Sequence, residues 1–173
     1  MKKYELTEET VTVYGKTLYR IRAVRDFGSV KTGEFGGYIE KEENLSHFGN
    51  AWISGDAWVY GDARVFDNAK VYGDAKVYGD AWVYGNAWVY GNAEVFNTRH
   101  FFVQGPIGSR DGYVTFYRTK DDTIGVRCGC FSGSLQKFVD RVEETHGGSR
   151  YEKEYKIAAE LAKVCIRLEG ESR

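Results

Sequence analysis

Two cysteines in the segment Cys128-Gly129-Cys130 are the residues whose type and spacing come closest to metal chemistry. Residues two apart on an extended strand face the same side, so the two thiols would lie side by side. A tetrahedral zinc site would need two further ligands, and the chain offers Cys165 and His146 at spacings unlike those of zinc motifs. Cys128 and Cys130 are therefore candidate metal ligands. The alternative is that they are small residues buried beneath helices.

A candidate anion site lies in the turn Gly108-Ser109-Arg110-Asp111-Gly112. The backbone N–H groups of such a turn, together with the Arg110 guanidinium, are able to hold an anion. The turn lacks the sequence of a phosphate-binding loop, so a simple connector is the alternative. We keep Arg110 as a candidate partner-binding residue.

The elements that must position these residues are organised around eight six-residue repeats that fill residues 49–96. The third residue of each repeat is Ala and the fifth is Val or, once, Ile53, so both should point inward from a short strand. Gly-Asp and Gly-Asn pairs turn the chain, because these residues tolerate positive φ. This period predicts a mainly β fold with a hexapeptide β-helix. The pattern resembles the left-handed parallel β-helix of hexapeptide-repeat proteins, whose triangular prism has three repeats per coil.

The repeat count predicts a short prism with two ends that need covering. A degenerate repeat at Glu43–Phe48 would bring the total to nine repeats, or three coils, roughly 15 Å tall. In this frame His47 takes an inward fifth position and acts as a capping residue. We expect an N-terminal β-hairpin cap (1–42), the β-helix (43–97) and a C-terminal ββαα module (98–173), because raw ends leave backbone groups unpaired.

Both flanking segments carry their own secondary-structure signals. The expected strands are Val11–Tyr14 and Thr17–Val24, which turn at Gly15-Lys16, and Tyr113–Thr119 and Thr123–Phe131, which follow a loop containing Pro106. Apolar residues at helical spacing predict one helix from Leu135 to the Gly147-Gly148 pair. A second helix should begin at Ser149, with Glu152 completing a capping box. Its expected buried stripe is Tyr151, Tyr155, Ala158, Ala162 and Cys165.

The outward positions of the repeats are rich in aromatic and cationic side chains. Stacking by eighteen residues places Lys70 between Trp52 and Trp88, in position for cation–π contacts. A soluble monomer rarely leaves so much contiguous aromatic surface bare, so the chain's own caps, a second copy or a foreign partner should cover at least one face. The candidate partner-binding residues of the faces are Trp52, Lys70, Tyr72, Trp88, Tyr90, Trp58, Tyr60, Tyr78 and Trp82.

The composition of the chain restricts the cellular location and the classes of partner that we expect. The chain has 24 Lys and Arg residues against 25 Asp and Glu residues, which argues against membrane binding and against direct nucleic-acid binding. It has no apolar stretch long enough to span a membrane, and its first ten residues lack the apolar core of a signal peptide. Three cysteines fit a reducing compartment, so we expect a cytoplasmic location.

Several segments resemble a family of bacterial and prophage hexapeptide-repeat proteins. They are Leu18–Ala23, Gly36–Ser46, the GDAxVYGNA repeats, and the tail motifs GSRDG, TFYRTKDD, CGCFSGSL and THGGSRYEKEY. Members are commonly labelled transferases or polymer-forming proteins. The phage connection implies a non-enzymatic protein that binds a host protein and blocks it, for example in an anti-CRISPR or other anti-defence role. The binding surface would be the aromatic faces of the β-helix, the C-terminal module, or both. We expect such a protein to need no cofactor and to self-associate as a dimer or trimer.

The alternative that the resemblance implies is an acyltransferase using acetyl-coenzyme A. Many hexapeptide β-helix proteins use a histidine base near a coenzyme A site between neighbouring prisms. Residues 49–96 contain no histidine and no extruded loop, so a base within the prism is missing. His100, just past the last coil, is the candidate catalytic residue of this alternative, and a packing role is its other interpretation.

Overall fold

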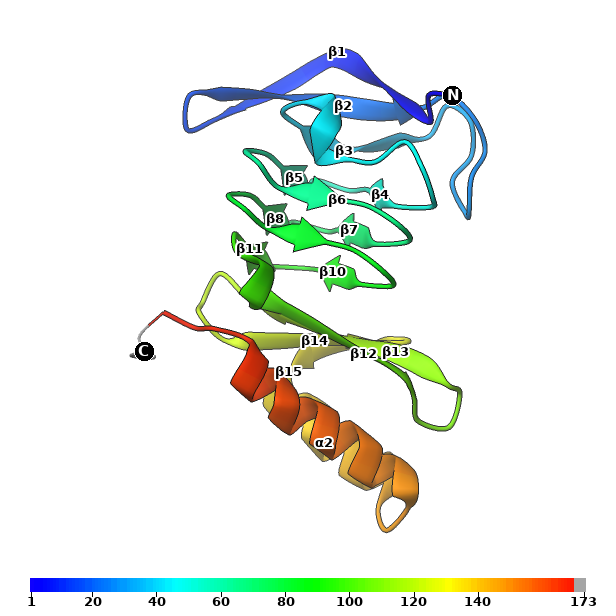
Figure 1. Cartoon of the computed structure of the whole chain (residues 1–173), viewed down its shortest axis with the longest axis vertical. Coiled ribbons are helices and arrows are strands. Elements are labelled where there is room, and N and C mark those ends of the chain that lie inside the picture. The colour runs from blue at the N-terminus through cyan, green and yellow to red at the C-terminus, as the bar shows by residue number, and fades with distance from the viewer. Residues whose placement is uncertain (170–173) are drawn as a thin grey trace.

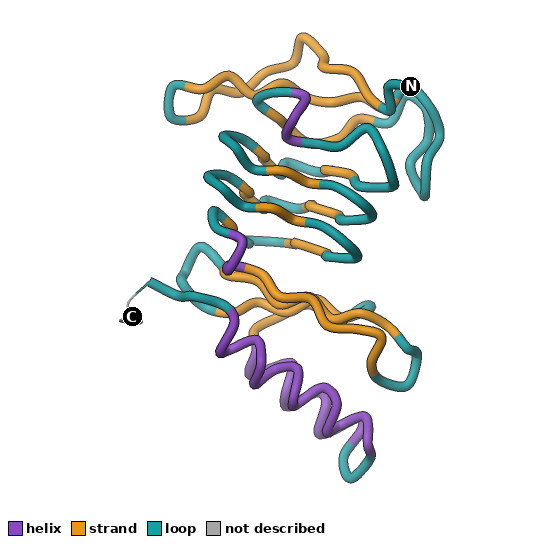
Figure 2. Tube along the Cα trace, in the orientation of Figure 1, coloured by secondary structure: helices purple, strands orange, loops and turns teal. Residues whose placement is uncertain are grey.

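The computed structural model describes residues 1–169 as a short β-solenoid held between two caps (Figure 1). An N-terminal hairpin covers one end of the solenoid, and a sheet with two helices covers the other. Within the coils, short strands alternate with turns (Figure 2). The predicted mainly β class, with about three stacked coils and two C-terminal helices, is confirmed. Neither helix in the described part of the chain is long and apolar enough to cross a membrane.

Three columns of parallel strands form the faces of the solenoid. We call them the groove face, the cap face and the open face. The groove face contains β4 (Trp52–Ile53), β7 (Lys70–Tyr72) and β10 (Trp88–Tyr90). The cap face contains β3 (Phe35–Ile39), β5 (Trp58–Val59), β8 (Lys76–Val77) and β11 (Glu94–Val95). The open face contains β6 (Arg64–Val65) and β9 (Trp82–Val83).

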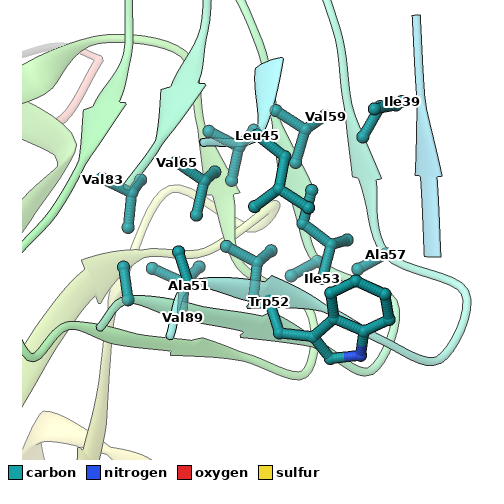
Figure 3. Close-up of a cluster of buried hydrophobic side chains, with 14 of the residues drawn as sticks. Ile39, Leu45, Ala51, Trp52, Ile53, Ala57, Val59, Val65, Val83 and Val89 are labelled. Atoms are coloured by element: carbon teal, nitrogen blue, oxygen red, sulfur yellow. The ribbon is translucent and has the colours of Figure 1, made fainter. Parts of the chain in front are cut away.

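The repeats set both the register and the core. Lys70 pairs with Trp52 on one side and with Trp88 on the other, which is the predicted spacing of eighteen residues. The inward Ala and Val side chains of the repeats are no more than 1% exposed. Figure 3 shows Ile39, Val59 and Val83 among the side chains that converge inside the coils. This buried column is the main core of the fold, because apolar burial is its chief stabilising contribution.

The first coil starts earlier, and in a different frame, than the sequence predicted. Strand β3 pairs with β5, so the solenoid begins with β3 and not at residue 43. Leu45 bridges to Val65 and therefore takes the inward fifth position, after the short 3-10 helix η1 (Glu42–Asn44). The expected repeat Glu43–Phe48 is thus out of register by two residues. The physical reason is a two-residue insertion at the corner before Gly49.

The inserted residues are His47 and Phe48, and neither points into the prism. The His47 ring stacks on Tyr4 with 4.3 Å between ring centroids, and its Nδ1 accepts a hydrogen bond from the Lys3 N–H. Phe48 is 81% exposed. His47 therefore contacts the N-terminal cap, as expected of a capping residue, but from outside the coil.

The N-terminal cap extends the cap face into one continuous sheet. Strands β1 (Tyr4–Val13) and β2 (Lys16–Ala23) form the predicted hairpin, and β2 pairs antiparallel with β3. The turn is at Tyr14-Gly15, one residue before the expected place, because both residues have positive φ. On the outer face of β2, Arg20 and Arg22 form ion pairs with glutamates of β1.

A buried lysine closes the N-terminal end of the solenoid. Lys3 is fully buried, its Nζ donates a hydrogen bond to the Ala51 carbonyl at 2.7 Å, and it lies 4.9 Å from the centre of the Phe27 ring. Burial, with the positive charge of Arg25 adding to it, lowers the pKa of Lys3 from 10.5 to about 8.

This lysine should make stability depend on pH. Above pH 8 the folded chain loses the Lys3 proton, whereas the unfolded chain keeps it up to about pH 10.5, so the unfolded state binds more protons in this interval. The free energy of unfolding should rise by roughly 2 kcal/mol between pH 8 and about pH 9.5. Urea unfolding of Lys3→Met should lack this rise, and Lys2→Met, at an exposed position, should keep it. Equal pH profiles for Lys3→Met and the natural protein would contradict the assignment.

The C-terminal module has four strands where the sequence predicted two. They are β12 (Phe101–Ile107), β13 (Gly112–Arg118), β14 (Ile124–Cys128) and β15 (Phe131–Ser134), after the 3-10 helix η2 (Thr98–His100). The expected loop around Pro106 is wrong: the segment is the edge strand β12, where a proline is tolerated. The expected strand Thr123–Phe131 is split by a turn at Gly129, whose φ is +55°.

The sheet separates the last coil from the helices. Val114, Phe116 and Val126 pack with α1 (Leu135–His146) and α2 (Arg150–Cys165) in a second core. Alternate residues face the coil: the Thr115 hydroxyl accepts a hydrogen bond from the Trp88 N–H, and Tyr117 joins the solenoid core. Ser149 caps α2 as predicted, but Glu152 Oε2 accepts its hydrogen bond from the Gly148 N–H and not from Ser149, so the expected capping box is not closed. In the expected buried stripe of α2, Ala158 and Ala162 are buried as predicted, whereas Tyr151, Tyr155 and Cys165 are only partly covered.

Candidate functional site

The three aromatic faces have different environments. On the cap face, Tyr60 and Tyr78 stack with 5.0 Å between ring centroids, and Tyr78 stacks on Phe96 at 5.3 Å. The hairpin covers this ladder, so Tyr60 is only 6% exposed, and Trp58 packs beside it. The predicted partner-binding residues Trp58, Tyr60 and Tyr78 therefore hold the N-terminal cap on the solenoid.

On the groove face, Lys70 is not held between two tryptophans. Its Nζ lies 5.3 Å from the centre of the Trp88 ring. Trp52 turns instead toward the N-terminal cap, where it packs edge-on against Phe27 at 5.3 Å and Tyr4 at 6.4 Å and is only 4% exposed. Figure 3 shows its indole outside the column of inward side chains. The cation–π prediction is thus correct for Trp88 and wrong for Trp52.

The C-terminal module covers the lower part of the groove face through Arg127. The Arg127 guanidinium lies 5.7 Å from the Trp88 ring centre and 5.4 Å from that of Tyr90. A hollow of about 680 Å³ runs from the loop at residues 28–30 along Lys70 to Arg127. The Tyr72 hydroxyl and Arg127 Nε are buried without a hydrogen-bond partner in the described part of the chain. Sequence reasoning missed Arg127 because its contact with Trp88 depends on how the C-terminal module docks on the last coil.

The open face is the one that the caps cover least: Phe101 of β12 meets Tyr84 edge-on at 5.8 Å, and both Tyr84 and Trp82 stay exposed. Trp82 is 48% exposed and Tyr84 is 46% exposed. Phe66 stacks on Tyr84 at 5.3 Å and meets Trp82 edge-on at 6.2 Å, and Arg64 lies 5.6 Å from the Trp82 ring centre. Phe48 borders the same hollow as Phe66 and Trp82. We call these four aromatic residues, Phe48, Phe66, Trp82 and Tyr84, the open-face patch.

His100 is a packed residue. It is 6% exposed, its ring meets Phe96 edge-on at 4.3 Å, and its Nδ1 accepts a hydrogen bond from the Phe96 N–H. Burial, with the positive charge of Arg118 adding to it, lowers the pKa of His100 to about 4. His100 is therefore a weaker base than a free imidazole. Its burial and its low pKa do not favour its use as the catalytic base of an acyltransferase.

The candidate metal ligands Cys128 and Cys130 and the candidate anion-binding turn also make contacts within the fold. Cys128 ends β14 and Cys130 follows the Gly129 turn, so the two thiols do not share one strand as predicted. Within residues 1–169, no group of three or more His, Cys, Asp or Glu side chains is arranged to hold a metal ion. In the turn before β13, the Gly108 N–H donates a hydrogen bond to Glu154 Oε2 at 2.7 Å, so a carboxylate of the chain takes this backbone donor of the expected anion site.

Comparison with known proteins gives a match within the repeats. A family model described as the YdcK beta solenoid repeat matches residues 75–91, which contain β8, β9 and β10. The chain is a β-solenoid repeat protein. The match falls on the coil whose outer residues include Trp82, Tyr84 and Trp88. No curated protein matches the chain.

Proposed function

We propose that this protein is a non-enzymatic binding protein that holds a protein partner on the open-face patch. The observation that carries the proposal is the contrast between the faces: the caps cover the aromatic residues of two faces and leave Trp82 and Tyr84 about half exposed. Interface centres are enriched in Tyr, Trp, Phe and Arg, and the patch combines four aromatic residues with Arg64.

The target class rests on sequence resemblance. The likeness to bacterial and prophage hexapeptide-repeat proteins favours a host protein as the partner, and a component of a defence complex is the target we propose. Blocking such a component needs a surface that binds and no catalytic group. Self-association through the same patch is the competing use of this surface.

Removing the two exposed rings should abolish partner binding and leave the fold intact. We expect Trp82→Ala combined with Tyr84→Ala to weaken binding about 100-fold, because each ring at an interface centre contributes about 2 kcal/mol or less once coupling is counted. The measurement is capture from bacterial lysate with mass-spectrometric identification, followed by titration of the purified partner. Thermal unfolding should change little, because both rings project outward from the core.

Tyr14→Ala is the matched control, since Tyr14 is an exposed ring on the hairpin turn, 88% exposed and far along the chain from the patch. It should bind the partner like the natural protein. Equal capture by the double variant would overturn the proposal. Sedimentation that shows an oligomer for the natural protein and a monomer for the double variant, with no captured partner, would assign the patch to self-association instead.

A further inference from the structure

A second cavity lies where the last coil, β14 and α1 meet. Its volume is about 760 Å³, and Trp88, Phe131 and Tyr155 are among the apolar residues that line it. Sites for small molecules are usually of 300–1,000 Å³, largely apolar, and placed where two structural units join. The cavity bends around the turn at Gly129 between β14 and β15: Trp88 lies on the coil side of the sheet, and Phe131 and Tyr155 lie on the helix side. It is separate from the open-face patch.

The charges that line this cavity are of one sign. Arg110, Arg127 and Arg141 line it, and none of its lining residues is Asp or Glu. The chain as a whole has a net charge of −1, so the cavity is a local concentration of positive charge. Arg141 pairs with Glu144 at 3.5 Å. Within residues 1–169, neither Arg110 nor Arg127 has a salt bridge, so their charge is available to an anion.

Arg127 is held in place for this role. Its guanidinium lies against the rings of Trp88 and Tyr90, and its Nη1 makes only long hydrogen bonds of 3.4 Å, to the carbonyls of Cys130 and Phe131. Its Nε is buried, and the Tyr72 hydroxyl on the groove face lies beside the guanidinium. A guanidinium group that makes only such long hydrogen bonds can form a stronger, charge-assisted hydrogen bond with an anionic oxygen.

We propose that this cavity binds a small amphipathic organic anion. Its carboxylate or phosphate group pairs with Arg127 on the coil side of the sheet, beside Trp88, and Arg110 adds positive charge at the cavity. Its apolar body passes the turn at Gly129 and lies against Phe131 and Tyr155 on the helix side. The arginines explain the acidic group, and the aromatic wall explains the apolar body. The inference is independent of the proposed protein-binding function, because it uses neither the open-face patch nor its residues.

Calorimetric titration of the full chain tests the ligand class with four probes. Octanoate carries a carboxylate, octyl phosphate carries a phosphate, 1-octanol has the apolar body without charge, and inorganic phosphate has the charge without the body. We expect octanoate or octyl phosphate to bind once per chain and at least 10-fold tighter than 1-octanol or inorganic phosphate. Binding of neither amphipathic anion, or equal binding of 1-octanol, would overturn the proposal.

Variants test the place of binding. Arg110→Gln removes an exposed charge at the cavity, and Thr145→Phe puts a ring into it from α1; each should weaken the binding of the amphipathic anion at least 10-fold. Gln136→Phe adds the same ring at an exposed position of α1 outside the cavity and should bind like the natural protein. If both cavity variants keep the affinity of the natural protein, the anion binds elsewhere and the assignment is wrong.

Discussion

Replacing Arg118 by Met is expected to lower the free energy of unfolding by about 3 kcal/mol. The side chain is only 4% exposed, its Nε donates a hydrogen bond to Asp122 Oδ1 at 2.8 Å, and its guanidinium lies 4.9 Å from the Phe96 ring centre. It also donates a hydrogen bond to the Glu94 carbonyl at the end of the last coil. Removing it leaves carboxylates without their cation where the C-terminal module meets the solenoid.

Urea unfolding measures this loss, and Arg99→Met is the control because Arg99 is exposed on η2. A second readout separates the lost charge from lost packing. The positive charge of Arg118 contributes to the low pKa of His100, so an NMR titration of Arg118→Met should find the His100 pKa above 4. A stability change within about 0.5 kcal/mol of that of Arg99→Met would contradict the assigned role.

Gly49→Ala is expected to destabilise the fold by about 3 kcal/mol. Gly49 has a φ of +69°, and a Cβ atom there would lie 2.3 Å from the backbone oxygen of Asp67 in the next coil. The substitution therefore combines an unfavourable backbone conformation with a clash against backbone that cannot move freely. The expected measurement is the shift of the urea midpoint at unchanged slope.

Gly85→Ala separates these two causes. Gly85 opens a later repeat with a nearly identical φ of +66°, but a Cβ atom there would meet nothing within 4 Å. Its substitution should destabilise by only about 1 kcal/mol, from the backbone conformation alone. Equal stabilities of the two variants would show that the close approach of the coils at Gly49 has no energetic consequence.

The parts of the fold that could be predicted are those that short stretches of sequence encode. The Ala and Val positions placed the core, and the eighteen-residue stacking placed Lys70 beside Trp88. The Ser149 cap and the N-terminal hairpin could also be predicted, because neighbouring residues encode them. The first coil was misplaced because the insertion of His47 and Phe48 interrupts the period, so a count of six along the chain loses its frame there.

The candidate site was less predictable than the fold, and single residues show why. The Pro106 segment becomes a strand only because β13 supplies a neighbour, which no local signal encodes. Arg127 reaches Trp88 only because the module docks on the last coil. Phe48 joins the open-face patch only through the insertion that places it at a corner. The contacts of Arg127 and Phe48 join segments that are distant along the chain.

The sequence by itself determined the solenoid, its inward residues and the stacked outward columns, because each hexad carries the alternation and the turn that build one side of a coil. Only the tertiary structure decided what each column does. The hairpin docks on the ladder that contains Tyr60, the C-terminal sheet brings Arg127 to Trp88, and Trp82 and Tyr84 are left exposed. The three columns are chemically alike, so the difference between core, groove and exposed surface comes from where the caps pack.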